Sequence, residues 1–209
     1  MKICNKDTVL FLSGGSTPKS LYEALAKNKK LKLGAVALVD ERFGKKMHQN
    51  SNEKMIKETG FFDHLKEKKI PVFKILQNKS LSQTSEDYQK KVSNLLLTYK
   101  NKTAILGVGV DGHIAGLPVG TQNLKLKPQK KNDLVNSFSN FPGEFPKRIT
   151  LTFNALSKFN NLIVLVFGQE KQKALNQMFK KGKTEKIPAR FLIKKEIIGR
   201  VILITDQKI

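Results

Sequence analysis

The sequence has a single cysteine, Cys4, and no tryptophan among its 209 residues. One cysteine cannot form an internal disulfide bond, so a disulfide-stapled secreted domain is excluded and the reducing cytoplasm is the expected location. No apolar run approaches the roughly 18 residues of a membrane helix, and the N-terminus lacks the apolar core of a signal peptide. No cluster of cysteine and histidine has the spacing of metal ligands, so no metal site is expected.

Acidic residues are also scarce. The 39 Lys and Arg residues far outnumber the 17 Asp and Glu residues, which gives a formal net charge of +22. Such an excess attracts polyanions without specificity. The lysines are nevertheless spread along the whole chain, with denser runs only at Lys125–Lys131 and Lys180–Lys186, and no basic run is interleaved with stacking aromatic residues. We therefore expect a diffusely basic surface that suits an anionic small molecule, and no nucleic-acid partner.

Short apolar runs alternate along the chain with segments that have one apolar face at helical spacing. Strands are expected at Thr8–Leu12, Ala35–Val39, Val72–Leu76, Ala104–Leu106, Arg148–Phe153, Leu162–Phe167 and Val201–Ile204. Helices are expected after Pro18, over Ser51–Thr59, from a capping box at Thr84, and around Ala174 to Phe179. Residues 117–145 are expected to be mostly loop, with a short strand at 134–135. The alternation predicts an α/β fold: one three-layer α/β/α domain over residues 1–209 with a Rossmann-like, mostly parallel sheet.

Chemically reactive residues follow four of the expected strands. They form the turns Ser13–Thr17, Asp40–Arg42, Asp111–His113 and Gly168–Lys171. The carboxyl ends of parallel strands lie at one edge of a sheet, and open α/β sheets bind their ligands at that edge. The sequence therefore predicts that the four turns meet around one pocket.

The first of these turns is rich in glycine and opens a helix. It consists of Ser13, Gly14, Gly15, Ser16 and Thr17. Free backbone N–H groups at the start of a helix converge on one point, and the helix dipole favours an anion there. Thr17 is expected to cap the helix, with Pro18 at its first position. We interpret this turn as a phosphate site.

The third turn contains one of only three histidines, His113, with Asp111 two residues before it. Imidazole titrates near neutral pH in general, so a histidine beside a carboxylate is a candidate general base. Taken alone, the stretch Leu106–His113 is equally compatible with a glycine turn that carries a surface histidine. The other two histidines, His48 and His64, lie in charged segments and are expected at the surface.

Two nucleotide-binding patterns are incomplete. Residues 107–112 match G-x-G-x-x-G, but that fingerprint requires a helix to follow at once, and Pro118 between Gly116 and Gly120 disfavours one. Gly182-Lys183-Thr184 is similar to the end of a phosphate-binding P-loop, but position 177 is Gln where that motif needs Gly. Neither pattern is therefore taken as a nucleotide-binding site.

Five motifs, in this order along the chain, resemble the 6-phosphogluconolactonase family, within a wider group that includes the glucosamine-6-phosphate deaminases. They are Leu12–Pro18, Asp40–Arg42 with Ser51-Asn52, Leu106–His113, Arg148–Thr152, and Gly168 with Lys171. The resemblance implies hydrolysis of 6-phospho-D-glucono-1,5-lactone to 6-phosphogluconate in the oxidative pentose phosphate pathway. It implies an enzyme that needs no cofactor, and we expect a monomer or a small homo-oligomer.

The resemblance also implies a role for each candidate residue. His113 would take a proton from the attacking water, and Asp111 would hold the imidazole and favour its charged form. The Ser13–Thr17 turn, Arg148 and Lys171 would bind the phosphate group, with Arg42 as a further cationic contact. Asp40 would line the sugar pocket.

Two alternatives stay open. Ile114-Ala115 after the histidine is similar to the deaminases, which continue with Phe-Asn-Glu and carry Asp-Glu-Tyr in place of Asp-Glu-Arg. Here Arg42 and Gly116-Leu117-Pro118 stand at those positions, and no nearby glutamate substitutes. The sequence therefore favours lactone hydrolysis over a deaminase or isomerase, and over a non-catalytic polyanion binder on the same fold.

Overall fold

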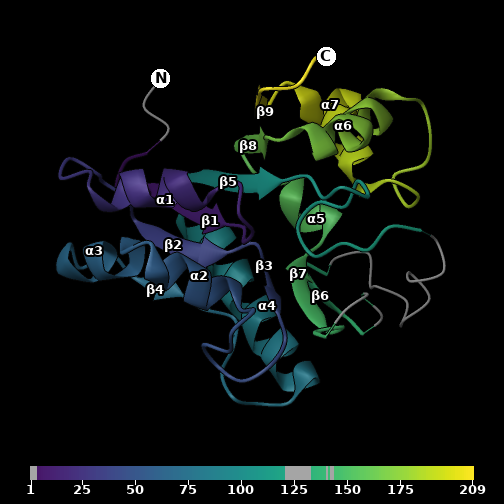
Figure 1. Cartoon of the computed structure of the whole chain (residues 1–209). Helices are drawn as coiled ribbons and strands as arrows, with labels where there is room; N and C mark the ends of the chain where they lie inside the picture. The colour runs from purple at the N-terminus through teal and green to yellow at the C-terminus, as the bar shows by residue number, and fades with distance from the viewer. Residues whose placement is uncertain (1–3, 121–132, 140, 142–143) are drawn as a thin grey trace.

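The computed structural model describes residues 4–120, 133–139, 141 and 144–209 (Figure 1). Its larger sheet has six strands, all parallel, in the order β4-β2-β1-β5-β8-β9. The strands are β1 (Thr8–Leu12), β2 (Ala35–Leu38), β4 (Val72–Phe73), β5 (Asn101–Gly107), β8 (Asn161–Val166) and β9 (Val201–Thr205). The predicted α/β fold with a mostly parallel sheet is confirmed.

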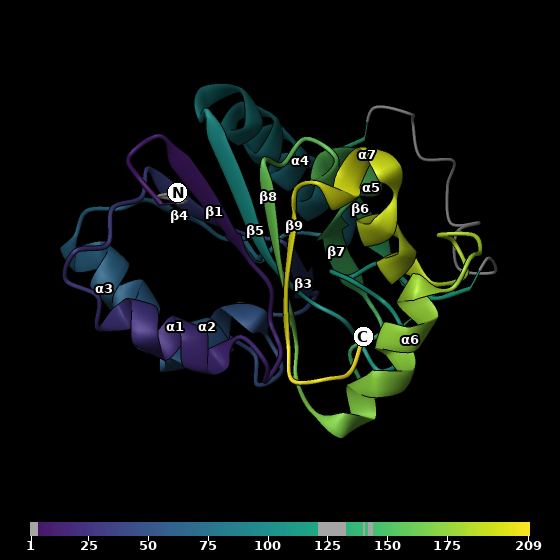
Figure 2. The ribbon, with the colours of Figure 1, turned by 90° about the horizontal axis from the view of Figure 1, so that it is seen from above.

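Helices cover the larger sheet on both sides. They are α1 (Lys19–Ala26), α2 (Asn52–Glu58), α3 (Phe61–Glu67), α4 (Leu81–Thr98), α5 (Phe153–Leu156), α6 (Gln172–Phe179) and α7 (Lys195–Ile198). Figure 2 shows α1, α2 and α3 on one side, and α4, α6 and α7 on the other. Crossovers between parallel strands are right-handed, so the helices change sides where the strand order reverses. That reversal falls between β1 and β5, and their carboxyl ends therefore border a crevice.

A second, smaller sheet is antiparallel and has the order β3-β7-β6, from β3 (Asp40–Arg42), β7 (Arg148–Leu151) and β6 (Val135–Phe138). The prediction of a turn at Asp40–Arg42 is therefore wrong. Val39 joins the two sheets, because its N–H donates to the Leu12 carbonyl and its carbonyl accepts from the Leu151 N–H, both at 2.9 Å. The chain thus passes from one sheet into the other without a turn.

Several expected element ends are corrected. Helix α1 begins at Lys19 with no side-chain cap, so Thr17 does not cap it. Helix α4 begins at Leu81, and its capping box is formed by Ser80 and Gln83 rather than by Thr84. Strand β4 is only two residues long, and β7 ends at Leu151 because the Thr152 hydroxyl caps α5 through the Ala155 N–H at 3.1 Å.

Buried apolar side chains form one cluster that includes residues of both sheets, such as Phe11 of β1 and Ile149 of β7. This continuity supports the proposal that residues 1–209 form a single domain. His48 is half-buried rather than fully at the surface, because its ring stacks on Phe145 at a centroid distance of 4.4 Å. Among the described helices, none combines the length and the apolar character that spanning a bilayer requires.

Candidate active site

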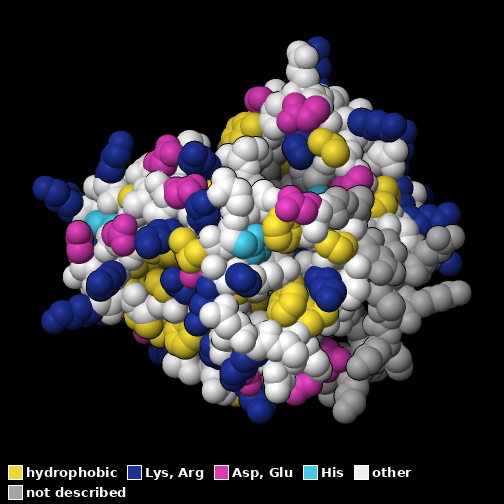
Figure 3. All heavy atoms as spheres, turned by 60° about the horizontal axis from the view of Figure 1, so that its bottom comes forward, with side chains coloured by type: hydrophobic (Ala, Val, Ile, Leu, Met, Phe, Trp, Pro, Cys, Tyr) yellow, Lys and Arg dark blue, Asp and Glu magenta, His cyan; other side chains and the backbone are white. Residues whose placement is uncertain are grey.

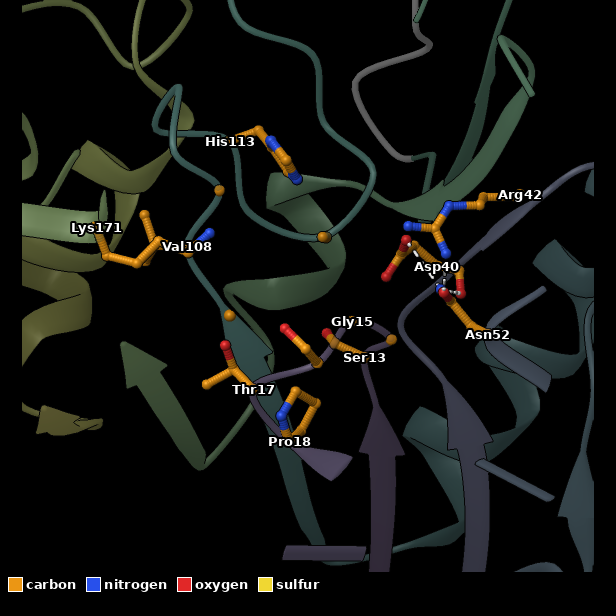
Figure 4. A pocket seen from close by; sticks show the side chains of 15 residues that line it. Ser13, Gly15, Thr17, Pro18, Asp40, Arg42, Asn52, Val108, His113 and Lys171 are labelled. Carbon is orange, nitrogen blue, oxygen red and sulfur yellow. Dashed lines mark hydrogen bonds between the residues drawn. The ribbon is translucent and has the colours of Figure 1, made fainter. Parts of the chain in front are cut away.

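A cavity of about 230 Å³ opens at the carboxyl ends of β1 and β5, where the strand order reverses (Figure 4). Its lining residues are Ser13, Gly14, Gly15, Ser16, Thr17, Pro18, Asp40, Arg42, Asn52, Gly107, Val108, Gly109, His113, Ala115 and Lys171. Residues from all four predicted turns therefore meet in one place. In the close-up, His113 lies across the cavity from the Ser13–Pro18 turn, and Lys171 and Arg42 lie on opposite sides.

The glycine-rich turn presents unused hydrogen-bond donors. Within the described part of the chain, the backbone N–H groups of residues 14–17 donate to no protein acceptor, and the buried Ser13 hydroxyl has no partner. Gly15 has a φ of +93°, a left-handed conformation that favours glycine, and a side chain there would meet only open space. The Tyr22 hydroxyl fixes the turn from below by donating to the Ser13 carbonyl at 2.7 Å. Such a set of free donors suits an anion.

His113 is held by a tight loop after β5. The Gly109 N–H donates to the His113 carbonyl at 2.8 Å, and Gly112 has a φ of +91°. Asp111 Oδ1 lies 2.6 Å from His113 Nδ1 and also accepts the His113 backbone N–H at 3.1 Å. Because an ionised carboxylate only accepts, Nδ1 carries the proton and Nε2 is left to act in the cavity.

Asp111 does not line the cavity but stands behind the imidazole. Burial favours the neutral acid, yet the hydrogen bond and the charge of His113 outweigh it and lower the pKa of Asp111 to about 2. The side chains of His113 and Asp111 are 37% and 51% exposed, so water reaches both. The pair can accept a proton from water at Nε2 and stabilise the resulting imidazolium.

Strand β3 supplies two charged groups to the opposite wall. Asp40 is buried, and burial raises the pKa of its carboxyl, while nearby cations, Arg42 first among them, oppose that rise. Arg42 Nη1 donates to Asn50 O and Asn52 Oδ1, each at 3.0 Å. The sequence prediction did not include Asn52 as a site residue, although Ser51-Asn52 belongs to one of the five motifs.

Lys171 and Arg148 have different surroundings. Lys171 ends the 3₁₀ helix Gln169–Lys171, lines the cavity, and takes part in none of the ion pairs of the described residues. Arg148 is not among the lining residues. It lies directly opposite Arg42 in the β3–β7 pair, with its guanidinium 4.8 Å from the centroid of the Phe141 ring. Burial, followed by the charge of Arg42, lowers the pKa of Arg148. A phosphate contact for Arg148 therefore stays a prediction.

Positive charge is not confined to the cavity. Figure 3 shows Lys and Arg side chains scattered over the face in view, with acidic side chains between them. For that face, this agrees with the diffuse surface charge that the sequence predicts, while the basic run Lys125–Lys131 lies outside the described residues. In the described part of the chain, no group of three His, Cys, Asp or Glu side chains could hold a metal ion.

A family model described as glucosamine-6-phosphate isomerases/6-phosphogluconolactonase matches residues 4–202. The chain belongs to this family. The resemblance seen in the five motifs is thereby confirmed.

Individual relatives of the isomerase/lactonase family agree with this assignment. The chain is 33% identical over 178 residues to a 6-phosphogluconolactonase of Xylella fastidiosa, which covers 79% of this chain and 69% of the relative. It is 31% identical over 201 residues to one of Helicobacter pylori, with 90% and 80% covered. The crystal structure of 6-phosphogluconolactonase from Thermotoga maritima superposes with a TM-score of 0.77 at 27% identity, covering 96% of this chain and 85% of that one.

Proposed function

We propose that the chain hydrolyses 6-phospho-D-glucono-1,5-lactone to 6-phosphogluconate. The observation that carries this proposal is the cavity itself. It has an imidazole backed by a carboxylate on one side and, facing it, backbone N–H groups and a lysine that have no acceptor or ion-pair partner among the described residues. The names of the relatives support the same activity.

The proposed reaction is a water attack on the lactone carbonyl. His113 Nε2 takes a proton from the water as its oxygen bonds to the carbonyl carbon, and Asp111 stabilises the imidazolium that forms. When the tetrahedral intermediate collapses, the bond to the ring oxygen breaks and the imidazolium returns the proton to that oxygen. The product is the open-chain acid. The proposed steps use only side chains and water.

The phosphate group of the substrate is proposed to lie on the Ser13–Thr17 turn. Its oxygens would accept the free N–H groups of residues 14–17 and the Ser13 hydroxyl, with the Lys171 ammonium as the counter-charge. Arg42 is proposed to contact the substrate from the opposite wall, and Asp40 to accept a sugar hydroxyl. The oligomeric state and the cytosolic location stay predictions.

A deaminase or isomerase is the second candidate on this fold. Ring opening by such an enzyme would draw on a carboxylate after the histidine, and Ala115 to Pro118 supply none.

The decisive assay follows the opening of freshly made 6-phosphogluconolactone against its spontaneous rate. Ammonia release from glucosamine 6-phosphate is measured beside it. Catalysed ammonia release without lactone hydrolysis contradicts the proposal, and salt-sensitive duplex binding with neither activity supports the polyanion binder.

Replacing Lys171 by alanine is expected to raise KM for the lactone about tenfold or more, with kcat little changed, because a charged hydrogen bond contributes roughly 1.5–3 kcal/mol to binding. Arg148→Ala is expected to raise KM less, since Arg148 does not line the cavity. Lys173→Ala is the matched control, because it removes the same charge at an exposed position of α6. An equal effect of Lys171→Ala and Lys173→Ala would mean that only the overall charge matters.

Asp111→Asn keeps the size and an acceptor oxygen of the side chain but removes its charge. We expect kcat to fall about 10- to 100-fold with KM nearly constant, because the imidazolium forms only during the reaction. The pKa of Asp111 is about 2, below its ordinary value, so the wild-type carboxylate loses its charge only in strong acid. The two kcat values are therefore compared at the alkaline plateau of each pH profile, where the imidazole is neutral and the wild-type carboxylate is charged. A folded variant that keeps the wild-type kcat at this plateau contradicts the assignment.

A further inference from the structure

Asn52 is the first residue of α2, is only 2% exposed, and reaches across to two charged residues of β3. Its Nδ2 donates to the Asp40 backbone carbonyl at 2.9 Å and to Asp40 Oδ2 at 3.3 Å. Its Oδ1 accepts from Arg42 Nη1 at 3.0 Å. The dashed lines in Figure 4 show the amide between the carboxylate and the guanidinium.

The Asn52 amide is oriented so that it can hydrogen-bond to both Asp40 and Arg42. Its NH₂ end needs an acceptor and its oxygen needs a donor, and only the orientation present here satisfies Asp40 and Arg42 together. Asp40 and Arg42 are two residues apart on a strand, so their side chains leave the same face and would otherwise be free to pair. Within the described part of the chain they form no ion pair with each other.

The charge of Arg42 is consequently not cancelled by a bonded carboxylate. Its two side-chain hydrogen bonds go to neutral oxygens, the Asn50 carbonyl and the Asn52 amide. Asn52 also packs closely against the Ser13–Thr17 turn. A Cβ atom placed on Gly14 would lie only 1.8 Å from Asn52 Oδ1, so this position has no room for a side chain. The buried Asn52 amide therefore contacts both the cavity wall that carries Asp40 and Arg42 and the Ser13–Thr17 turn.

We propose that Asn52 is a positioning residue that keeps Asp40 and Arg42 apart, so that the guanidinium faces the substrate as an unpaired cation and the carboxylate stays free to accept a substrate hydroxyl. The proposal rests on the function proposed above. A carboxylate at position 52 would instead pair with Arg42 and lose the N–H that holds Asp40. An alanine there would let Asp40 and Arg42 pair directly.

The test measures KM and kcat for the lactone in the wild type, Asn52→Asp, Arg42→Ala and the double variant. Asn52→Asp is expected to raise KM about tenfold, the equivalent of about 1.4 kcal/mol of binding, with a smaller change in kcat. In the Arg42→Ala background the same substitution is expected to change KM less than about twofold, because the cation that it neutralises is absent.

Folding is followed by thermal unfolding of each variant. Asn52→Ala provides a second route if Asn52→Asp does not fold, and its KM is expected to rise in the same way. The control is Asn50→Ala, since the exposed Asn50 binds Arg42 through its backbone carbonyl and not through its side chain. Asn50→Ala should leave KM unchanged.

An unchanged KM in a folded Asn52 variant overturns the proposal, and so does a rise of equal size with and without Arg42. Failure of the proposed function is seen separately, as a wild type that does not hydrolyse the lactone. In that event, calorimetric binding of 6-phosphogluconate to the same four proteins decides the role of Asn52. An Arg42-dependent loss of affinity supports it, and an Arg42-independent loss or no loss refutes it.

Discussion

His113→Ala is expected to lower kcat for lactone hydrolysis by about 10²- to 10⁴-fold, which is the usual contribution of a positioned general base. The reason is geometric. Asp111 binds Nδ1 and so leaves Nε2 as the basic atom in the cavity, and no other histidine lines it. The rate above spontaneous ring opening is measured with saturating lactone. KM should change much less, because the substitution leaves the proposed phosphate-binding groups, the Ser13–Thr17 turn and Lys171, in place.

The control for this variant is His64→Ala. His64 is also partly exposed, but its Nε2 lies 3.0 Å from the Asn28 carbonyl, away from the cavity. Both variants should keep the wild-type melting temperature to within a few degrees, since neither ring is in the core. If His113→Ala retains wild-type kcat while folded, His113 is not the base, and the mechanism must be abandoned.

The meeting of distant turns could be predicted because it follows from topology alone. Parallel strands place their carboxyl ends at one edge, so four apolar runs ending in Ser13, Asp40, Asp111 and Gly168 already define a common region. The common location of the four turns follows from the direction of the strands and not from the residues of each turn. The sequence therefore predicts most of the cavity wall, including His113 and Lys171.

Strand β3 could not be predicted in the same way. The segment Asp40–Arg42 carries three consecutive charges, which is typical of a solvated turn. Its pairing with Arg148–Leu151 joins residues more than a hundred positions apart, and no local pattern encodes that register. The role of Asn52 was missed for a related reason. An amide side chain does not ionise, so the local sequence does not mark Asn52 as a site residue. Its hydrogen bonds to Asp40 and Arg42 form only once the chain has folded.

Helix ends were misjudged where two signals compete. Ser80-x-x-Gln83 and Thr84-x-x-Asp87 both have the spacing of a capping box, and the structure uses the first. Thr84 is fully buried in the first turns of α4, where it is part of the core rather than a cap. A capping pattern states where a helix can begin, and packing selects among the possible starts.

Glu41→Ala is expected to lower the free energy of unfolding by about 3 kcal/mol, a large share of the 5–15 kcal/mol typical of a domain. Glu41 has no exposed surface, and its carboxyl oxygens accept the backbone N–H groups of Arg42, Asn52 and Glu53 at 2.7–2.8 Å. Burial raises the pKa of this carboxyl to about 8, although the three hydrogen bonds oppose the rise. Two of these donors are the first N–H groups of α2, which have no partner within the helix. Removing the carboxyl group leaves the buried N–H groups of Asn52 and Glu53 unsatisfied, together with the partly buried N–H group of Arg42.

Glu41→Gln is the graded control for this prediction. It keeps one acceptor oxygen and the volume of the side chain, so it should cost less than Glu41→Ala in urea or thermal unfolding. Because Glu41 anchors the end of α2 that carries Asn52, the alanine variant should also raise KM for the lactone while leaving the His113–Asp111 pair in place. A folded alanine variant within about 0.5 kcal/mol of wild type would show that α2 is held by its apolar contacts instead, through Ile56 in the core.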